Sequence, residues 1–202
     1  AIEINPKNDG AYHIKGMLYN EMGAYSKAIS SYDKAIKLND TFPAYYFNRG
    51  NVYLNCFLYE KAIINYTTAI EIDSTVTKIF FNRSEAYLAL KEYQIAIPDF
   101  KNDISCNGEN EKNLGDLGMC YMNILMYDSA MYFYDKALGL SPDDPINLLN
   151  KGVLYLRMNR FGQAFPYVKR AHEYGVDSHH LYERYYGVVI KLFEALVQSL
   201  SS

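Results

Sequence analysis

A period of 34 residues runs through this chain and constrains its fold more than any other feature of the sequence. The residues on this period are four glycines and one serine: Gly16, Gly50, Ser84, Gly118 and Gly152. A tyrosine follows each of them after three residues, and an alanine follows after twelve. A period kept over five units without an insertion predicts a tandem array, in which every unit packs on its neighbours.

Composition and charge exclude several classes of protein. Half of the 202 residues are apolar, so the chain can bury a sizeable core, and the net charge of −3 is spread over residues of both signs. Nucleic-acid binding needs a basic stripe that this sequence lacks, and no run of about eighteen apolar residues predicts a membrane span. The cysteines Cys56, Cys106 and Cys120 form no CxxC pair, and such unpaired thiols favour a reducing compartment such as the cytoplasm.

Each unit is expected to hold two amphipathic helices, because apolar residues recur at helical spacing. In the second repeat we expect the first helix to run from about Pro43 to Phe57 and the second from Tyr59 to Ile72. Pro98 and Pro166 fall at equivalent places within the second helices of their units. Proline removes a backbone hydrogen bond there, so we expect a kinked or late-starting helix at both.

The period divides the chain into units with defined bounds. We expect repeats at 9–42, 43–76, 77–110, 111–144 and 145–178. Residues 1–8 read as the tail of a truncated upstream repeat, because their sequence matches the ends of later second helices, so the native N-terminus and any targeting signal are not visible. Residues 179–202 depart from the period and predict a C-terminal capping helix with apolar residues on more than one face.

The repeat resembles the tetratricopeptide repeat family, whose signature places an aromatic residue, Leu-Gly, Tyr, Ala, a second aromatic and Pro at fixed offsets. Three units carry the match best: the first with Tyr12, Gly16, Tyr19, Ala28, Tyr32 and Ala35, the second with Tyr46, Gly50, Tyr53, Ala62, Tyr66 and Ala69, and the fourth with Leu117, Gly118, Tyr121, Ala130, Tyr134, Ala137 and Pro142. The resemblance implies an all-α fold: a right-handed superhelical α-solenoid of tandem helix-turn-helix units, closed by a capping helix.

The resemblance also implies a concave groove lined by the first helix of each unit, and asparagines stand out among its residues. An amide offers both donors and acceptors, so a row of amides can bind the main chain of an extended peptide. Alternatively, asparagine is only a tolerated polar residue on an exposed helix face. The predicted groove site comprises Phe47, Asn48, Asn51, Lys78, Phe81, Asn82, Lys112 and Asn150, with the two phenylalanines forming apolar pockets.

Some members of the family hold a peptide's terminal carboxylate with a clamp of five residues from three units. Asn51, Asn82 and Lys112 match three of those positions, whereas Phe47 replaces a lysine and Asp116 replaces an arginine. Because Asp116 repels a carboxylate, the sequence argues against this kind of ligand.

Catalytic and cofactor motifs are absent: the chain has no P-loop, nucleotide fingerprint, GxSxG or HExxH. His179, His180 and Glu183 fit a solvated helix start better than a metal site. The sequence therefore predicts a non-enzymatic scaffold, without cofactor or metal, whose groove binds a peptide or helical segment of another protein. The alternative is self-assembly, as a homodimer formed through the apolar C-terminal helix or the repeat edges.

Overall fold

The computed structural model describes residues 7–75 and 78–175, and these residues hold ten α-helices and no strand. They form two compact units that divide after Gly108. The predicted capping helix at 179–202 and residues 1–6 of the predicted upstream tail lie outside the described residues. The first unit contains α1 (Asp9–Glu21), α2 (Tyr25–Leu38), α3 (Pro43–Asn55), α4 (Tyr59–Ile72), α5 (Lys78–Ala89) and α6 (Tyr93–Asn107), and the second contains α7 (Glu111–Asn123), α8 (Tyr127–Leu140), α9 (Pro145–Arg157) and α10 (Phe161–Glu173).

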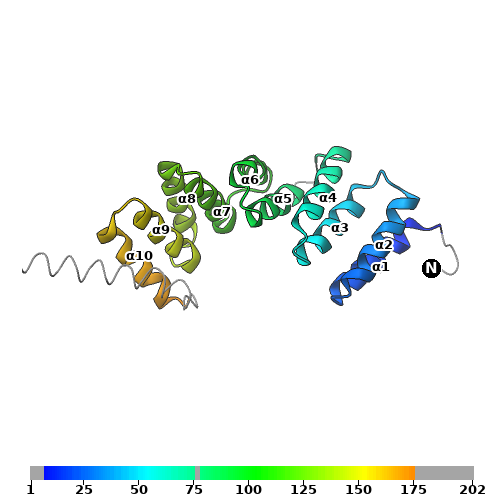
Figure 1. Cartoon of the computed structure of the whole chain (residues 1–202), viewed down its shortest axis with the longest axis horizontal. Helices are drawn as coiled ribbons and strands as arrows, with labels where there is room; N and C mark the ends of the chain where they lie inside the picture. The colour runs from blue at the N-terminus through cyan, green and yellow to red at the C-terminus, as the bar shows by residue number, and fades with distance from the viewer. Residues whose placement is uncertain (1–6, 76–77, 176–202) are drawn as a thin grey trace, which may run out of the picture. The chain divides into compact units, whose positions relative to one another are not determined.

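Helices pack in consecutive pairs within each unit (Figure 1). In the first unit α1 packs on α2, α3 on α4 and α5 on α6, while in the second α7 packs on α8 and α9 on α10. Contacts of α2 with α3, α4 with α5 and α8 with α9 join one pair to the next. The first helices of neighbouring pairs also meet, and these contacts are α1 with α3, α3 with α5, and α7 with α9. This arrangement confirms the predicted all-α solenoid.

Glycine on the 34-residue period lets the two helices of a pair approach closely. A Cβ atom placed on Gly50 would lie 2.7 Å from the ring of Tyr66, and one on Gly118 would lie 2.9 Å from the ring of Tyr134. Protein interiors are close-packed, so no such contact can be accommodated without a shift of the ring. Both tyrosines have an exposed fraction of 0%, and each therefore fills the core of its own repeat.

Every first helix ends in the same turn. The residues that form it have positive φ angles between 59° and 69°, and they are Gly23, Phe57, Lys91, Leu125 and Asn159. After α7, the Leu125 N–H donates to the Met122 carbonyl at 3.2 Å and the Met126 N–H donates to the Tyr121 carbonyl at 2.9 Å. These two bonds define a Schellman motif, which satisfies the last carbonyls of the helix. Glycine adopts this left-handed conformation freely, so Leu125 carries backbone strain.

Arg83 on α5 ties together the second helices of two successive repeats. Its guanidinium donates to both carboxylate oxygens of Asp99 on α6, at 2.7 and 2.8 Å. It also donates to Oγ1 of Thr67 on α4 at 3.0 Å. The side chains of Arg83 and Asp99 are only 17% and 6% exposed, so this bidentate pair is largely shielded from water.

The equivalent cations of two other repeats make related contacts. Arg49 on α3 pairs with Asp33 on α2 at 2.5 Å and donates to Asn65 on α4 at 2.8 Å. In the second unit, Lys151 on α9 pairs with Asp135 on α8. A charged residue of the first helix therefore repeatedly reaches back to the second helix of the preceding repeat.

The prediction of a late-starting helix at the two prolines is wrong. α6 begins at Tyr93 and α10 at Phe161, in register with the other second helices, and both continue past Pro98 and Pro166. Both prolines are exposed, and buried residues close to them on the same helices, such as Phe100, anchor the helices. Packing thus outweighs the lost hydrogen bond. A kink at either proline stays a prediction.

Candidate functional site

The eight residues predicted to line a groove are divided between the two compact units. The second unit holds Lys112 and Asn150, and the first holds Phe47, Asn48, Asn51, Lys78, Phe81 and Asn82. Their contacts within each unit indicate which of them remain available to a ligand.

Three of the four predicted asparagines bind other residues of the array. Asn48 Nδ2 lies 2.7 Å from Nε2 of His13 on the preceding first helix. Asn51 Oδ1 accepts hydrogen bonds from Nδ2 of Asn82 and from the hydroxyl of Tyr66, both at 2.8 Å. These amides join the first helices of successive repeats, so they are already engaged within the protein.

The two predicted apolar residues pack within their own repeats. The ring centroid of Phe47 lies 6.0 Å from that of Tyr66, and the centroid of Phe81 lies 6.0 Å from that of Phe100. Both phenylalanines are half-buried, whereas Lys78 is exposed at the start of α5. Phe47 and Phe81 thus contribute to the packing between the two helices of a repeat.

Asn150 on α9 is equivalent to Asn48 and Asn82, but its amide is not held in the same way. Within the part of the chain that the structure describes, this amide has no hydrogen-bond partner. The residues that hold the other two asparagines are a histidine and an asparagine, and their equivalents on α7 are Gly115 and Met119. Glycine has no side chain, and a thioether is only a weak acceptor. The Asn150 amide therefore lacks the partners that hold Asn48 and Asn82.

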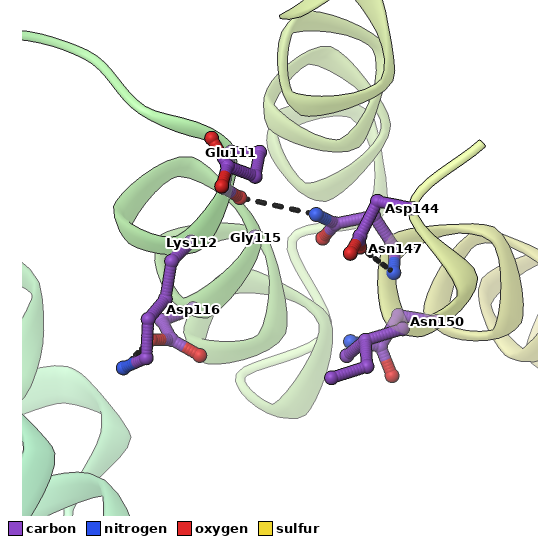
Figure 2. A pocket seen from close by; sticks show the side chains of 8 residues that line it. Glu111, Lys112, Gly115, Asp116, Asp144, Asn147 and Asn150 are labelled. Carbon is purple, nitrogen blue, oxygen red and sulfur yellow. Dashed lines mark hydrogen bonds and ion pairs between the residues drawn. The ribbon is translucent and has the colours of Figure 1, made fainter. Parts of the chain in front are cut away.

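A pocket of about 260 Å³ opens beside Asn150 (Figure 2). Gly115 lines this pocket, at a position where the other repeats carry the larger residues His13, Phe47, Phe81 and Leu149. The structure thus brings two of the predicted residues to one pocket. The N-terminal halves of α7 and α9 line this pocket with Glu111, Lys112, Gly115, Asp116, Asp144, Ile146, Asn147 and Asn150.

Asn147 fixes one wall of the pocket. Its Nδ2 donates to the main-chain carbonyl of Glu111 at 3.0 Å, and its own N–H donates to Oδ1 of Asp144 at 2.7 Å, which caps α9 (Figure 2). A Cβ atom on Gly115 would lie 2.1 Å from Asn147 Oδ1, so the contact requires glycine. Asn147 therefore couples α7 to α9 and fixes the width of the pocket.

Charged side chains surround the pocket unevenly. Lys112 and Asp116 pair at 3.3 Å on successive turns of α7. Glu111 and Asp144 add two more carboxylates, so the pocket carries three carboxylates and one ammonium group. This balance disfavours an anionic ligand and agrees with the sequence argument against a carboxylate clamp.

A buried hydroxyl in the same compact unit also has no partner within the described residues. Tyr134 on α8 is 0% exposed, and its hydroxyl makes no hydrogen bond within the described residues. Burial raises the pKa of this hydroxyl far above its ordinary value, and the nearby Asp116 carboxylate adds to the shift. The group is therefore a neutral hydrogen-bond donor, and an unpaired one is costly to bury.

Gly115, Asn147 and Tyr134 are not among the residues that the sequence predicts for the site. A comparison of the repeats with one another contains a signal for two of them. Gly115 stands where other repeats carry large side chains, and Met119 replaces the asparagine that holds the hydroxyl equivalent to that of Tyr134. The contact of Asn147 with a main-chain carbonyl has no such signal.

The described residues hold few other features of known chemistry. Residues 7–75 and 78–175 contain no group of three or more His, Cys, Asp or Glu side chains placed to hold a metal ion. Across the same ranges, no helix combines the length and apolar character needed to cross a bilayer. The cysteines are unpaired, with Cys56 half-buried, Cys106 exposed and Cys120 buried.

Several solved structures have a fold similar to that of this chain. YrrB, described as a TPR protein with an unusual peptide-binding site, aligns with a TM-score of 0.80 and 23% identity over 89% of this chain and 92% of that chain. MamA aligns with a TM-score of 0.73 and 23% identity over 79% and 93% of the two chains. MamA 41-end from Desulfovibrio magneticus RS-1 aligns with a TM-score of 0.78 and 14% identity over 82% of this chain and 94% of that chain.

Sequence comparisons agree with the fold. The family model described as TPR repeat matches residues 16–55, and the one described as tetratricopeptide repeat matches residues 43–75 and 112–144. A comparison with curated proteins finds no match. The 34-residue period, the paired helices and these matches agree, and the chain belongs to the tetratricopeptide repeat family.

Proposed function

We propose that this protein is a non-enzymatic interaction scaffold that binds a peptide segment of a partner protein at the pocket between α7 and α9. Stacked helical repeats create extended surfaces that such proteins use for binding. The lack of a catalytic motif in the sequence and of a metal-binding cluster in residues 7–75 and 78–175 supports a binding role.

The state of Asn150 carries the proposal. Its equivalents Asn48 and Asn82 are held by residues of the preceding first helix, whereas Asn150 lies beside a pocket with its amide unengaged within the described residues. An unengaged amide can donate to a peptide carbonyl and accept from a peptide N–H at the same time. A main-chain segment of a partner is therefore a fitting ligand.

The size and charge of the pocket support the same kind of ligand. A volume of about 260 Å³ lies below the range of about 300–1,000 Å³ that is typical of sites for whole small molecules. It suits one side chain of a peptide, with the main chain passing Asn150. Lys112 and Asp116 at the rim can pair with charged groups on either side of that residue.

Selection from a phage-displayed library of random peptides, panned against the purified chain, tests the proposal. Binding of the selected peptides is then measured by fluorescence anisotropy for the wild type and for Asn150→Ala. We expect Asn150→Ala to weaken binding about fivefold or more, because one or two hydrogen bonds are lost.

Asn102→Ala provides a matched control, because Asn102 is an exposed asparagine on α6. This variant should bind as the wild type does. Failure to select any peptide, or equal binding by wild type and Asn150→Ala, would rule out this site as the place of peptide binding.

A further inference from the structure

We propose that a carbonyl oxygen of the bound partner chain accepts hydrogen bonds from both Tyr134 and Asn150, and that it takes the place that Asn51 Oδ1 occupies in the first unit. The inference rests on the proposed function and names the chemistry of the ligand at that site. The carbonyl belongs to a main-chain peptide group or to an Asn or Gln side chain.

The first unit provides the internal template. There Asn51 Oδ1 accepts from the hydroxyl of Tyr66 on the second helix of its own repeat and from Nδ2 of Asn82 on the next first helix, both at 2.8 Å. One acceptor oxygen thus satisfies two donors that come from different helices. A carbonyl oxygen has two lone pairs, so it is suited to this role.

The second unit keeps both donors and lacks the acceptor. Tyr134 is equivalent to Tyr66, and Asn150 is equivalent to Asn82, but the residue equivalent to Asn51 is Met119. Within the described residues the Tyr134 hydroxyl and the Asn150 amide are both without a hydrogen-bond partner. A buried donor without an acceptor is unfavourable, so a ligand that supplies one gains binding energy from it.

The two tyrosine rings lie in the same way within their repeats. The ring of Tyr66 packs where a Cβ on Gly50 would be 2.7 Å away, and the ring of Tyr134 packs against Gly118 with a corresponding distance of 2.9 Å. In both cases the nearest ring atom is Cε1. The Tyr134 hydroxyl is therefore directed as that of Tyr66 is, toward the contact between successive first helices.

Access to the hydroxyl depends on Met119. This side chain is half-buried and has three rotatable bonds, so it can move aside for a ligand atom more easily than a branched residue. Asp116, which lines the pocket, lies three residues before Met119 on α7, so the two side chains share a face of that helix. A peptide bound in the pocket therefore lies beside Met119, and we expect it to reach the two donors by displacing this side chain.

The test uses a peptide selected by panning, carrying a fluorescent label, and compares the dissociation constants of the wild type, Tyr134→Phe and Met119→Asn. Tyr134→Phe removes one donor and should weaken binding about fivefold. Met119→Asn supplies an internal acceptor, as Asn51 does, so it should weaken binding at least as much while raising the melting temperature. The control is Tyr66→Phe, which should leave affinity within about twofold of the wild type.

The outcomes separate the two proposals. If Asn150→Ala weakens binding while Tyr134→Phe and Met119→Asn leave it unchanged, the carbonyl subsite is refuted and the peptide site stands. If no peptide is selected, both proposals fall. Melting curves of all the variants show that each is folded, and a lower melting temperature for Met119→Asn would contradict the equivalence with Asn51 on which the inference depends.

Discussion

The hydroxyl of Tyr66 donates a 2.8 Å hydrogen bond to Oδ1 of Asn51, whereas the equivalent hydroxyl of Tyr134 is buried without a partner in the described residues. The same substitution should therefore have different effects at the two places. Tyr66→Phe should lower the free energy of unfolding by about 1 kcal/mol, because the Asn51 acceptor loses a donor. Tyr134→Phe should be neutral or stabilising, because it removes a buried polar atom that makes no bond.

Thermal unfolding of both variants, followed by circular dichroism, measures this difference. An equal loss of stability at the two tyrosines would show that the Tyr134 hydroxyl has a partner, such as bound water, in solution.

The ion pair of Arg83 with Asp99 should be the most costly of the described pairs to break. The Asp99 side chain, 6% exposed, accepts two hydrogen bonds from the guanidinium, so Asp99→Ala leaves a partly buried cation without its partner. We expect a loss of about 3 kcal/mol in the free energy of unfolding. The exposed pair Lys169–Glu173 is the control, and Glu173→Ala should cost less than about 0.5 kcal/mol.

Urea unfolding of the two variants provides the measurement. A loss below about 1 kcal/mol for Asp99→Ala would mean that solvent replaces the lost pair at Arg83.

The strained turn after α7 offers a stabilising substitution. Leu125 has a φ of 65° and is 68% exposed. Its left-handed backbone conformation is therefore unfavourable, and its side chain gains little packing energy in return. Leu125→Gly should raise the free energy of unfolding by about 1 kcal/mol. Gly23→Ala is the matched control, because a Cβ at Gly23 meets no atom within 4 Å. We expect it to lower the free energy of unfolding by a similar amount, and this loss reflects only the φ of 69°.

The melting temperatures of the two variants should therefore move in opposite directions. A lower melting temperature for Leu125→Gly would show that the leucine side chain contributes more by packing than its backbone conformation costs.

His13 should make the stability of the first unit depend on pH. Burial lowers the pKa of His13 from its ordinary value of 6.5, so the unfolded chain binds this proton at a higher pH than the folded protein does. Its contribution to stability is complete above about pH 6.5 and is lost as the pH falls toward the folded pKa. The ring faces Tyr32 and Tyr45 and the Asn48 amide, and the nearby Asp9 carboxylate, held by Tyr45, has a lowered pKa and stays charged over this range.

His13→Gln keeps a polar side chain that cannot take up a proton. Melting temperatures measured between about pH 7.5 and pH 5.5 should fall more steeply for the wild type than for this variant. Parallel curves would show that the imidazole is as easily protonated in the folded state as in the unfolded chain.

The fold could be predicted from the sequence because the repeats serve as each other's comparison. Packing alone requires a small residue opposite a large aromatic one. The structure shows this contact at Gly50 with Tyr66 and at Gly118 with Tyr134. Pro98 misled the prediction of where α6 begins, because a local rule was applied to a helix whose position is set by the packing of the repeat.

The candidate site could be predicted only in part. Asn48, Asn51 and Asn82 lie on first helices, but hydrogen bonds to one another or to His13 occupy their amides. The sequence of one helix considered alone cannot reveal such pairs. Asn150 differs from Asn48 and Asn82 because α7 carries Gly115 and Met119 in place of the residues that hold those two amides. The decisive information is therefore the combination of a residue with its equivalent neighbours on the preceding first helix.

The Arg83 side chain donates hydrogen bonds to residues of both α4 and α6, and the Arg49 side chain donates to residues of both α2 and α4. In a one-dimensional array, the strength of the contacts between successive repeats decides how many repeats unfold together. Such an arginine therefore stabilises the interface between two successive repeats more than it stabilises either repeat alone. A single charge per repeat can thus set the length over which unfolding is cooperative, and its loss would let the array come apart in shorter segments under denaturant or mechanical load.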